Sequence, residues 1–296
     1  SMPDTYGYEV PEQRAQEVLK RFFQGPVNML DTSRNYAMGE SEKRIGIAIK
    51  ENGGWPENFV LSTKIDRNMD TLVLDKKRTR ESIEESLKTL NVDSVDILFL
   101  HDPEYVKDVN DITKKDGALD ELFKIKEEGL AKAVGLAMGK INIMFPLLKN
   151  WDFDVIINHN RYTLLNREAD EMYSYAHSKN ISIFNAAPYA GGVLAKGPSN
   201  FKKITYQDVT EEKLAPAREI EKVCKKYNVE MGAAALQFSM KDKRITSTIC
   251  GVTSVQSIEK NLAWAETDIP QEFWNEVLKL PYSTKDPESE RVYTPG

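Results

Sequence analysis

"VNMLDTSRNYAMGESEKRIGIAIKEN" is the sequence of residues 27–52, and its pattern decides the fold. An apolar run at 27–32 predicts a strand, and residues 41–52 place apolar side chains three and four positions apart, which predicts a helix. Between them lie Asp31, at the end of the strand, and Tyr36, in the loop that follows. A buried carboxylate at a strand end is costly unless it has a partner. This βα unit therefore predicts both a parallel sheet and a polar site.

The same alternation of strand and helix continues along the chain. Most of the predicted strands are nearly continuous apolar runs, which is typical of strands covered on both faces in a parallel sheet. The predicted strands span residues 27–32, 59–65, 95–101, 131–137, 154–160, 181–187 and 246–252.

Amphipathic segments between these strands predict helices. They span residues 11–23, 41–52, 76–90, 116–129, 167–180, 215–228 and 254–266. Asp75 and Ser254 are expected to cap two of them, and Gly129 and Asn180 to end two others. The polar stretch 198–213 is interpreted as a surface loop.

Seven strands alternating with helices are one strand short of a (β/α)₈ TIM barrel. The first strand of such a barrel would precede the helix at 11–23, and it is not evident in the sequence. We predict a single barrel domain over residues 1–296, with a first strand that is absent from this sequence. An open, doubly wound sheet is the structural alternative.

Composition narrows the classes of function. A net charge of −6 argues against nucleic acid as a partner, because phosphate binding needs a basic surface. No apolar run approaches the length of a membrane span, so no membrane partner is expected. Two cysteines, Cys224 and Cys250, suit a reducing, cytoplasmic compartment, and no metal site is expected. The oligomeric state is not predicted.

In a barrel, chemistry gathers at the carboxyl ends of the strands. Four ionisable side chains lie at or just after consecutive predicted strand ends: Asp31, Tyr36, Lys64 and His101. A phenol is a poor acid or base at neutral pH, and a neighbouring ammonium is expected to lower its pKa. In this interpretation Asp31 holds Lys64 charged, Tyr36 moves the proton, and His101 donates a hydrogen bond to the substrate oxygen.

These motifs resemble the successive signatures of the aldo-keto reductase superfamily. The segments that carry the resemblance are "LDTSRNYAMGESEKRIGIAI", "VLSTKI", "SIEESLKTLNVDSVDILFLHDPE" and "AVGLAM", and the similarity extends from about residue 6 to 279. The catalytic residues of that family match Asp31, Tyr36, Lys64 and His101. The resemblance implies a (β/α)₈ barrel that transfers hydride between a nicotinamide cofactor and a carbonyl or alcohol carbon.

The resemblance also implies where the dinucleotide binds. No G-x-G-x-x-G motif follows a strand, so the expected site is the barrel rim, in the loops 188–198 and 251–261. Glycines would let the backbone approach the pyrophosphate, and the helix start near Ser254 offers N–H groups to an anion. The expected cofactor-binding residues are Asp31, Ala137, Ala186, Gly191, Gly192, Gly251, Thr253, Ser254, Ser257 and Asn261.

Departures from the family pattern refine the expectation. The positions that bind the 2′-phosphate in NADP-using members are Gly251 and Ser257 here, which favours NAD, although Lys260 lies close enough in sequence to compensate. A Ser-Asn pair is replaced by Ala137 and Met138, and the aromatic that stacks on nicotinamide by Ala186.

Three further segments, at 159–170, 185–198 and 233–240, resemble the aldose 1-dehydrogenase branch, whose members lack the stacking aromatic. That branch includes L-fucose, D-threo-aldose and L-galactose dehydrogenases. The expected small-molecule substrate is therefore a sugar, with Arg34, Asn35 and Asp102 as candidate contacts for its hydroxyl groups.

The leading hypothesis is oxidation of an aldose C1 hydroxyl to a lactone, with Tyr36 as general base and NAD as cofactor. An NADPH-dependent aldehyde or ketone reductase, for which the substrate is a simple carbonyl compound, is one alternative. A nucleotide-binding regulatory module without turnover is another. A Schiff-base lyase with Lys64 as nucleophile would need a neutral lysine, which Asp31 opposes.

Overall fold

The computed structural model describes residues 9–291, and its main sheet has seven parallel strands in sequence order. All seven predicted strands are confirmed. They are β1 (Met29–Asp31), β2 (Val60–Ile65), β3 (Val95–His101), β4 (Ala131–Met138), β5 (Val155–His159), β6 (Ser182–Ala186) and β9 (Ser247–Ile249). Each pairs in parallel with the next, so their carboxyl ends meet at one rim.

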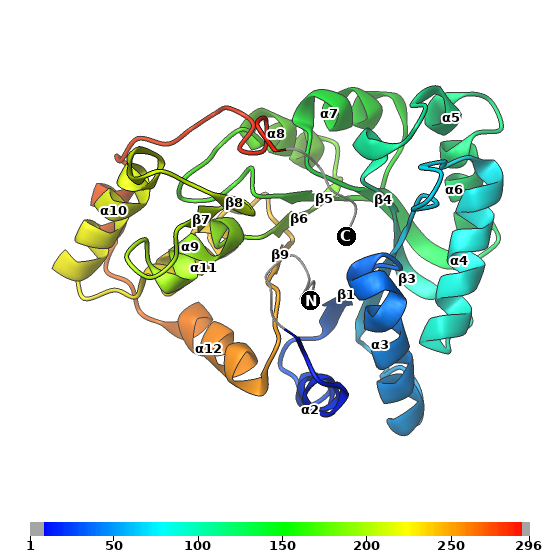
Figure 1. The fold of residues 1–296 in the computed structure, drawn as a ribbon, viewed down its shortest axis with the longest axis horizontal. Helices are drawn as coiled ribbons and strands as arrows, with labels where there is room; N and C mark the ends of the chain where they lie inside the picture. Colours follow the sequence, from blue (N-terminus) through cyan, green and yellow to red (C-terminus); the bar gives the residue numbers. More distant parts are fainter. Residues whose placement is uncertain (1–8, 292–296) are drawn as a thin grey trace.

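The sheet curves into a nearly closed barrel with the helices outside it (Figure 1). This confirms the predicted (β/α)₈ architecture over the alternative of an open, doubly wound sheet. The longer helices are α2 (Glu12–Phe22), α3 (Glu40–Glu51), α4 (Lys76–Leu90), α6 (Ala118–Glu127), α7 (Ile141–Asn150), α8 (Asp170–Ser178), α10 (Glu211–Lys226), α11 (Met231–Met240), α12 (Val255–Glu266) and α13 (Gln271–Val277). Two single-turn helices, α5 (Asn110–Thr113) and α9 (Val193–Lys196), complete the set within residues 9–291.

The barrel has a seam between β9 and β1. Within residues 9–291 no hydrogen-bonded ladder joins these two strands, which form the edges of the sheet. Outside the seam α2 packs against α12 (Figure 1), and Arg21 Nε donates to Glu259 Oε1 at 2.5 Å. Helices α2 and α12 thus connect the two edges of the sheet on the outside of the barrel.

Two apolar clusters stabilise the architecture. The larger one fills the space between the strands and the helices, with Ile65, Leu98 and Ile156 among its fully buried members. The smaller one fills the interior of the barrel and includes Phe99 and Phe184, whose ring centroids lie 6.3 Å apart. The interior is therefore a packed core, and a ligand must bind at the rim above it.

Local signals in the sequence set the ends of several helices. Asp75 accepts a hydrogen bond from the N–H of Arg78 at 2.8 Å, and Ser254 caps α12 in a capping box, as predicted. Gly129 and Asn180 adopt the left-handed conformation that ends a helix, with φ of +80° and +58°.

The interpretation of residues 198–213 as a surface loop is right for most of the stretch, which is exposed or half-buried, but incomplete. This stretch contains a short antiparallel hairpin, β7 (Lys203–Ile204) and β8 (Gln207–Asp208), and Thr205 in its turn is 1% exposed. Thr210 then caps α10, which begins four residues before the predicted start at 215. The sequence did not reveal the hairpin, because strands of two residues are too short to show an alternating pattern within a polar stretch.

Membrane association through a helix finds no support in the part of the chain that the structure describes. Every helix there is too short or too polar to cross a bilayer.

Candidate active site

A buried ion pair forms the base of the site. Lys64, on β2, is 1% exposed, and its Nζ lies 2.6 Å from Asp31 Oδ2 at the end of β1. Nζ also donates to the backbone carbonyl of Thr32 at 2.6 Å, and Ser62 Oγ donates to Asp31 Oδ1 at 2.7 Å. The ion pair and the bond to Thr32 fix the orientation of the Lys64 amine, and each charge of the pair compensates the other.

Tyr36 lies directly beside this pair. Lys64 Nζ is 4.6 Å from the centroid of the Tyr36 ring, and the ring of His101 meets that of Tyr36 edge-on at 5.8 Å. Tyr36 begins a short 3₁₀ turn in which Ala37 and Met38 adopt left-handed φ angles of +50° and +53°. Such conformations are costly for residues with a side chain and cluster at functional sites. The structure thus brings together all four predicted catalytic residues.

The expected lowering of the Tyr36 pKa is wrong for the protein alone. Burial, followed by the carboxylates of Asp31 and Asp102, raises the pKa of Tyr36 well above its ordinary value. In this state Tyr36 holds its proton.

His101, the last residue of β3, has a partner that sequence reasoning missed. Its Nδ1 lies 2.6 Å from Oδ1 of Asp66, which is 2% exposed and follows β2. Strand alternation was the available signal, because Asp66 is two residues beyond Lys64 and two-residue spacing places side chains on one side of a sheet. The site therefore contains two acid–base pairs, Asp31–Lys64 and Asp66–His101.

The three predicted substrate contacts do not all lie beside the catalytic residues. Asp102 Oδ2 lies 3.8 Å from His101 Nε2, which places it at the site. The N–H of Asn35 donates to Asp66 Oδ2 at 2.9 Å, so the backbone of Asn35 is tied to the site. Arg34 instead pairs with Glu85 on α4, with 3.3 Å between Arg34 Nε and Glu85 Oε2. Its guanidinium is therefore engaged away from the catalytic residues.

The loop 188–198 has a structural need for its glycines. Gly191 and Gly192 have φ of +74° and +116°. A Cβ on Gly191 would lie 2.8 Å from the N atom of Thr205, and one on Gly192 would lie 3.2 Å from the ring of Phe201. Close packing on the β7–β8 region thus accounts for both glycines without any ligand.

The loop before α12 is more open. A Cβ on Gly251 would meet nothing within 4 Å. Ser257 Oγ accepts hydrogen bonds from the N–H groups of Thr253 and Ser254, at 3.2 and 3.1 Å. A depression of about 320 Å³ lies at the start of α12, and Ser254 and Arg14 both line it. The loop therefore has open space next to a helix start, although Ser257 already accepts the hydrogen bonds of these two N–H groups and Glu17 also lines the depression.

The remaining predicted cofactor residues lie at the rim or in the barrel interior. Asn261 on α12 accepts a hydrogen bond from Tyr189 Oη at 2.7 Å, which orients its side-chain amide. Ala137 and Ala186 belong to the interior cluster, paired in register with His101 and His159 at the ends of their neighbouring strands.

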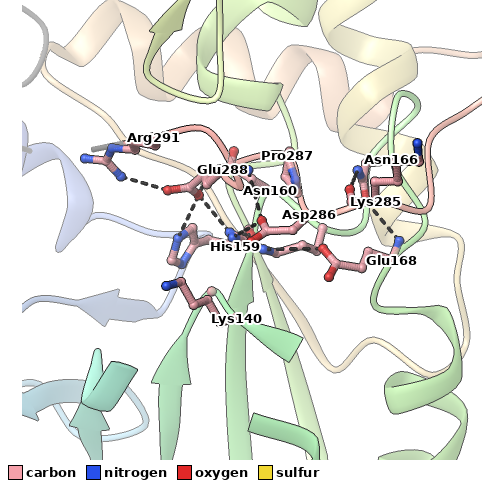
Figure 2. A network of polar contacts seen from close by, with 12 residues as sticks. Lys140, His159, Asn160, Asn166, Glu168, Lys285, Asp286, Pro287, Glu288 and Arg291 are labelled. Atoms are coloured by element: carbon pink, nitrogen blue, oxygen red, sulfur yellow. Dashed lines mark hydrogen bonds and ion pairs between the residues drawn. The ribbon is translucent and has the colours of Figure 1, made fainter. Parts of the chain in front are cut away.

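A second polar network, which the sequence did not predict, lies at the end of β5 (Figure 2). Residues 283–291, here called the C-terminal strap, pass over this end of the barrel. Arg161, 1% exposed, binds Glu288 at 2.7 Å and Asp286 at 2.6 Å. Figure 2 shows Glu288 between His159 and Arg291, at 3.3 and 2.7 Å. One buried guanidinium thus anchors the strap to the rim.

Glu168 is the third carboxylate near Arg161, at 3.7 Å from its Nε. Burial and the neighbouring Asp286 raise the pKa of Glu168 to about 7. In the unfolded chain a glutamate carboxyl has a pKa of about 4.3. Because the folded state raises this pKa, the folded protein becomes less stable relative to the unfolded chain as pH rises from about 4.3 to about 7.

We expect Glu168→Gln to remove this loss. Because solvent screens part of the charge, the variant should gain about 1 kcal/mol relative to the natural protein at pH 8 and almost nothing at pH 4.5. Urea unfolding at the two pH values measures the difference. An equal effect of the substitution at both would contradict the assignment.

The fold and the four converging side chains define a class of enzyme. A barrel with a phenol, a buried ammonium–carboxylate pair and an imidazole at the strand ends, matched by the aldo/keto reductase family over residues 3–280, makes this an NAD(P)-dependent oxidoreductase. The chain belongs to the aldo/keto reductase family, whose model matches residues 3–280.

The chain is similar to several characterised enzymes. It is 29% identical to an L-galactose dehydrogenase of Arabidopsis thaliana, over 86% of this chain and 78% of the relative. It is 27% identical to a D-threo-aldose 1-dehydrogenase of a Pseudomonas species, over 90% and 88% of the two chains. A pyridoxal 4-dehydrogenase of Microbacterium luteolum is 24% identical, over 90% and 89%.

A solved structure shows the same fold. The holo form of an aldo-keto reductase from Bacillus halodurans superposes with a TM-score of 0.77 at 19% identity, over 96% of this chain and 92% of that one.

Proposed function

We propose that this protein oxidises the anomeric C1 hydroxyl of an aldose to a lactone. The observation that carries the proposal is the convergence of Tyr36, the Lys64–Asp31 pair and His101 at one rim. The similarity to two aldose dehydrogenases, at 29% and 27% identity, supports the sugar as the substrate class. Carboxylates near the site, such as Asp102, suit a neutral polyol, because they accept hydrogen bonds from hydroxyl groups.

Each catalytic residue has a distinct role in this proposal. Tyr36 exchanges the proton of the C1 hydroxyl, and Lys64 stabilises the phenolate through its charge. Asp31 keeps Lys64 protonated and fixed. His101 donates a hydrogen bond to the same substrate oxygen, which favours the loss of its proton to Tyr36. The nicotinamide, when bound, takes up the hydride.

The proposed dinucleotide site is the open loop before α12. Gly251, Thr253, Ser254 and Ser257 would hold the phosphates there, and Asn261 the adenine. Gly191 and Gly192 would line the opposite loop, and Ala137 and Ala186 the nicotinamide end.

We infer that NAD is preferred over NADP. Lys260, the nearest basic residue on α12, is drawn to Glu230 at 3.7 Å and lies over the ring of Trp264 at 4.6 Å. A 2′-phosphate would therefore have to compete with these contacts for the charge of Lys260, the basic residue of this helix.

We expect kcat/KM to be at least about tenfold higher with NAD than with NADP, since one charge-assisted hydrogen bond is worth about 1.5–3 kcal/mol. Initial rates with each dinucleotide at saturating sugar test this. Equal values would mean that another group, such as Arg14, binds the 2′-phosphate.

The experiment that tests the proposed function is a substrate panel followed by nicotinamide absorbance. It tests the oxidation of L-fucose, L-galactose, D-arabinose and pyridoxal with NAD and with NADP. It also tests the reduction of simple aldehydes with the reduced form of each dinucleotide. Oxidation of an aldose with NAD supports the proposal. Turnover of pyridoxal alone, or nucleotide binding without any turnover, would overturn the choice of substrate class or of enzyme.

A second candidate function is reduction of an aldehyde or ketone with NADPH. The raised pKa of Tyr36 favours it, because a phenol that holds its proton is suited to donate it to a carbonyl oxygen. If the protein turned over only simple aldehydes, and only with NADPH, the result would support this second function over the oxidation of an aldose.

A further inference from the structure

Asp66 is the most completely engaged carboxylate near the reacting groups. Its Oδ1 lies 2.6 Å from His101 Nδ1. Its Oδ2 accepts hydrogen bonds from Ser33 Oγ at 2.6 Å and from the N–H of Asn35 at 2.9 Å. Ser33 and Asn35 lie in the loop that leads to Tyr36. One carboxylate therefore contacts the imidazole and the segment that carries the phenol.

The contact with Asp66 determines the form of the imidazole. A carboxylate accepts hydrogen bonds only, so at 2.6 Å His101 Nδ1 must carry the hydrogen. Nε2 then remains for the substrate, with Asp102 Oδ2 at 3.8 Å. The charged and titratable groups that act on His101 or contact it are Asp66, Asp102, Lys64 and Tyr36, and the neutral hydroxyl of Ser33 lies 3.2 Å from Nδ1.

These groups act on the charge of the imidazole in opposite directions. Burial alone would lower the pKa of His101, and Lys64 opposes a second cation. Asp66 and Asp102 outweigh both, so the pKa of His101 is raised. In turn, burial would raise the pKa of Asp66, but the charge and hydrogen bond of His101 hold it below its ordinary value. The geometry and the charges agree on an ion pair.

We propose that Asp66 is a positioning residue that keeps His101 as an imidazolium, with its Nε2–H available to the substrate oxygen, and that tethers the Tyr36 loop to it. This inference rests on the oxidoreductase chemistry proposed above, and not on the identity of the sugar. His101 keeps its proton throughout, and the substrate proton is exchanged with Tyr36. A charge-assisted donor stabilises the developing oxyanion more strongly than a neutral one.

Asp66→Asn is the decisive variant, because it preserves shape and removes the charge. We expect kcat to fall at least about tenfold, with little change in KM for the dinucleotide, because an oriented donor is lost in the transition state. We also expect the alkaline limb of the kcat–pH profile to move down by about one to three pH units. Asp75→Asn, at the cap of α4 and outside the site, is the matched control and should leave both unchanged.

A spectroscopic measurement tests the same inference without turnover. The chain has three histidines, so the His101 ring signal can be assigned by its absence in His101→Gln. In the natural protein we expect its titration midpoint above the ordinary value of about 6.5, and in Asp66→Asn a midpoint at least about one unit lower.

The outcomes separate this inference from the proposed function. A midpoint below about 6.5 in the natural protein overturns the inference, even if Asp66→Asn fails to fold. So does an unchanged alkaline limb in a folded Asp66→Asn. A Tyr36→Phe variant that retains full activity would instead defeat the proposed mechanism.

Discussion

Replacing Tyr36 with phenylalanine is expected to lower kcat at least about 100-fold, which is the usual contribution of a positioned proton-transfer group. The ring would remain against Lys64 and His101, so the packing of the site is preserved. Only the hydroxyl that exchanges the substrate proton is lost. The affinity for the dinucleotide should therefore stay nearly unchanged. Single-turnover rates and fluorescence titration with the dinucleotide measure the two quantities separately.

Tyr175→Phe provides the matched control. Tyr175 lies on α8, where its ring packs on Phe145 at 5.4 Å between centroids, outside the catalytic cluster. This variant should keep the activity of the natural protein. If Tyr36→Phe also did so, the phenol could not be the proton-transfer group, and the proposed mechanism would have to be abandoned.

The Arg161→Met variant is expected to lower the free energy of unfolding by about 3–5 kcal/mol, which is typical when one partner of a buried ion pair is removed. Arg161 binds both Asp286 and Glu288 of the C-terminal strap. Without it, Glu288, at 5% exposure, keeps its contacts with His159 and Arg291 but loses the buried guanidinium. Urea unfolding at pH 7 measures the loss.

An exposed ion pair on the same strap supplies the control. Lys213 Nζ lies 2.6 Å from Glu290 Oε2, and the two side chains are 56% and 74% exposed. Lys213→Ala should therefore cost less than about 1 kcal/mol. A loss in Arg161→Met no larger than that of the control would show that burial of the guanidinium does not stabilise the strap.

The fold was predictable wherever the residues of a single strand or helix showed a hydrophobic pattern of their own. Apolar runs of six or seven residues identified the strands, because most of the strands are covered on both faces by the barrel interior and the helices. Helix α11 was missed because Met231–Met240 is buried almost all round and so lacks an amphipathic period. The β7–β8 hairpin was missed because each of its strands has only two residues, too few to show a strand pattern.

The site was predictable to the extent that strand ends determine it. Asp31, Lys64 and His101 close consecutive strands, and parallel pairing brings them to one rim. The partners of Arg161 were not predictable, because Asp286 lies 125 residues further along the chain and no local pattern links them. The direction of the Tyr36 pKa was also beyond reach, since it depends on how burial and carboxylates balance in three dimensions.

The seam of the barrel has a consequence for behaviour at high concentration. Strands at the edge of a sheet can recruit strands from other molecules, and length is what makes them effective templates. Here the edge strands, Met29–Asp31 and Ser247–Ile249, have only three residues each. Such brief edges offer few backbone groups for intermolecular pairing, so the gap between them is a poor starting point for aggregation.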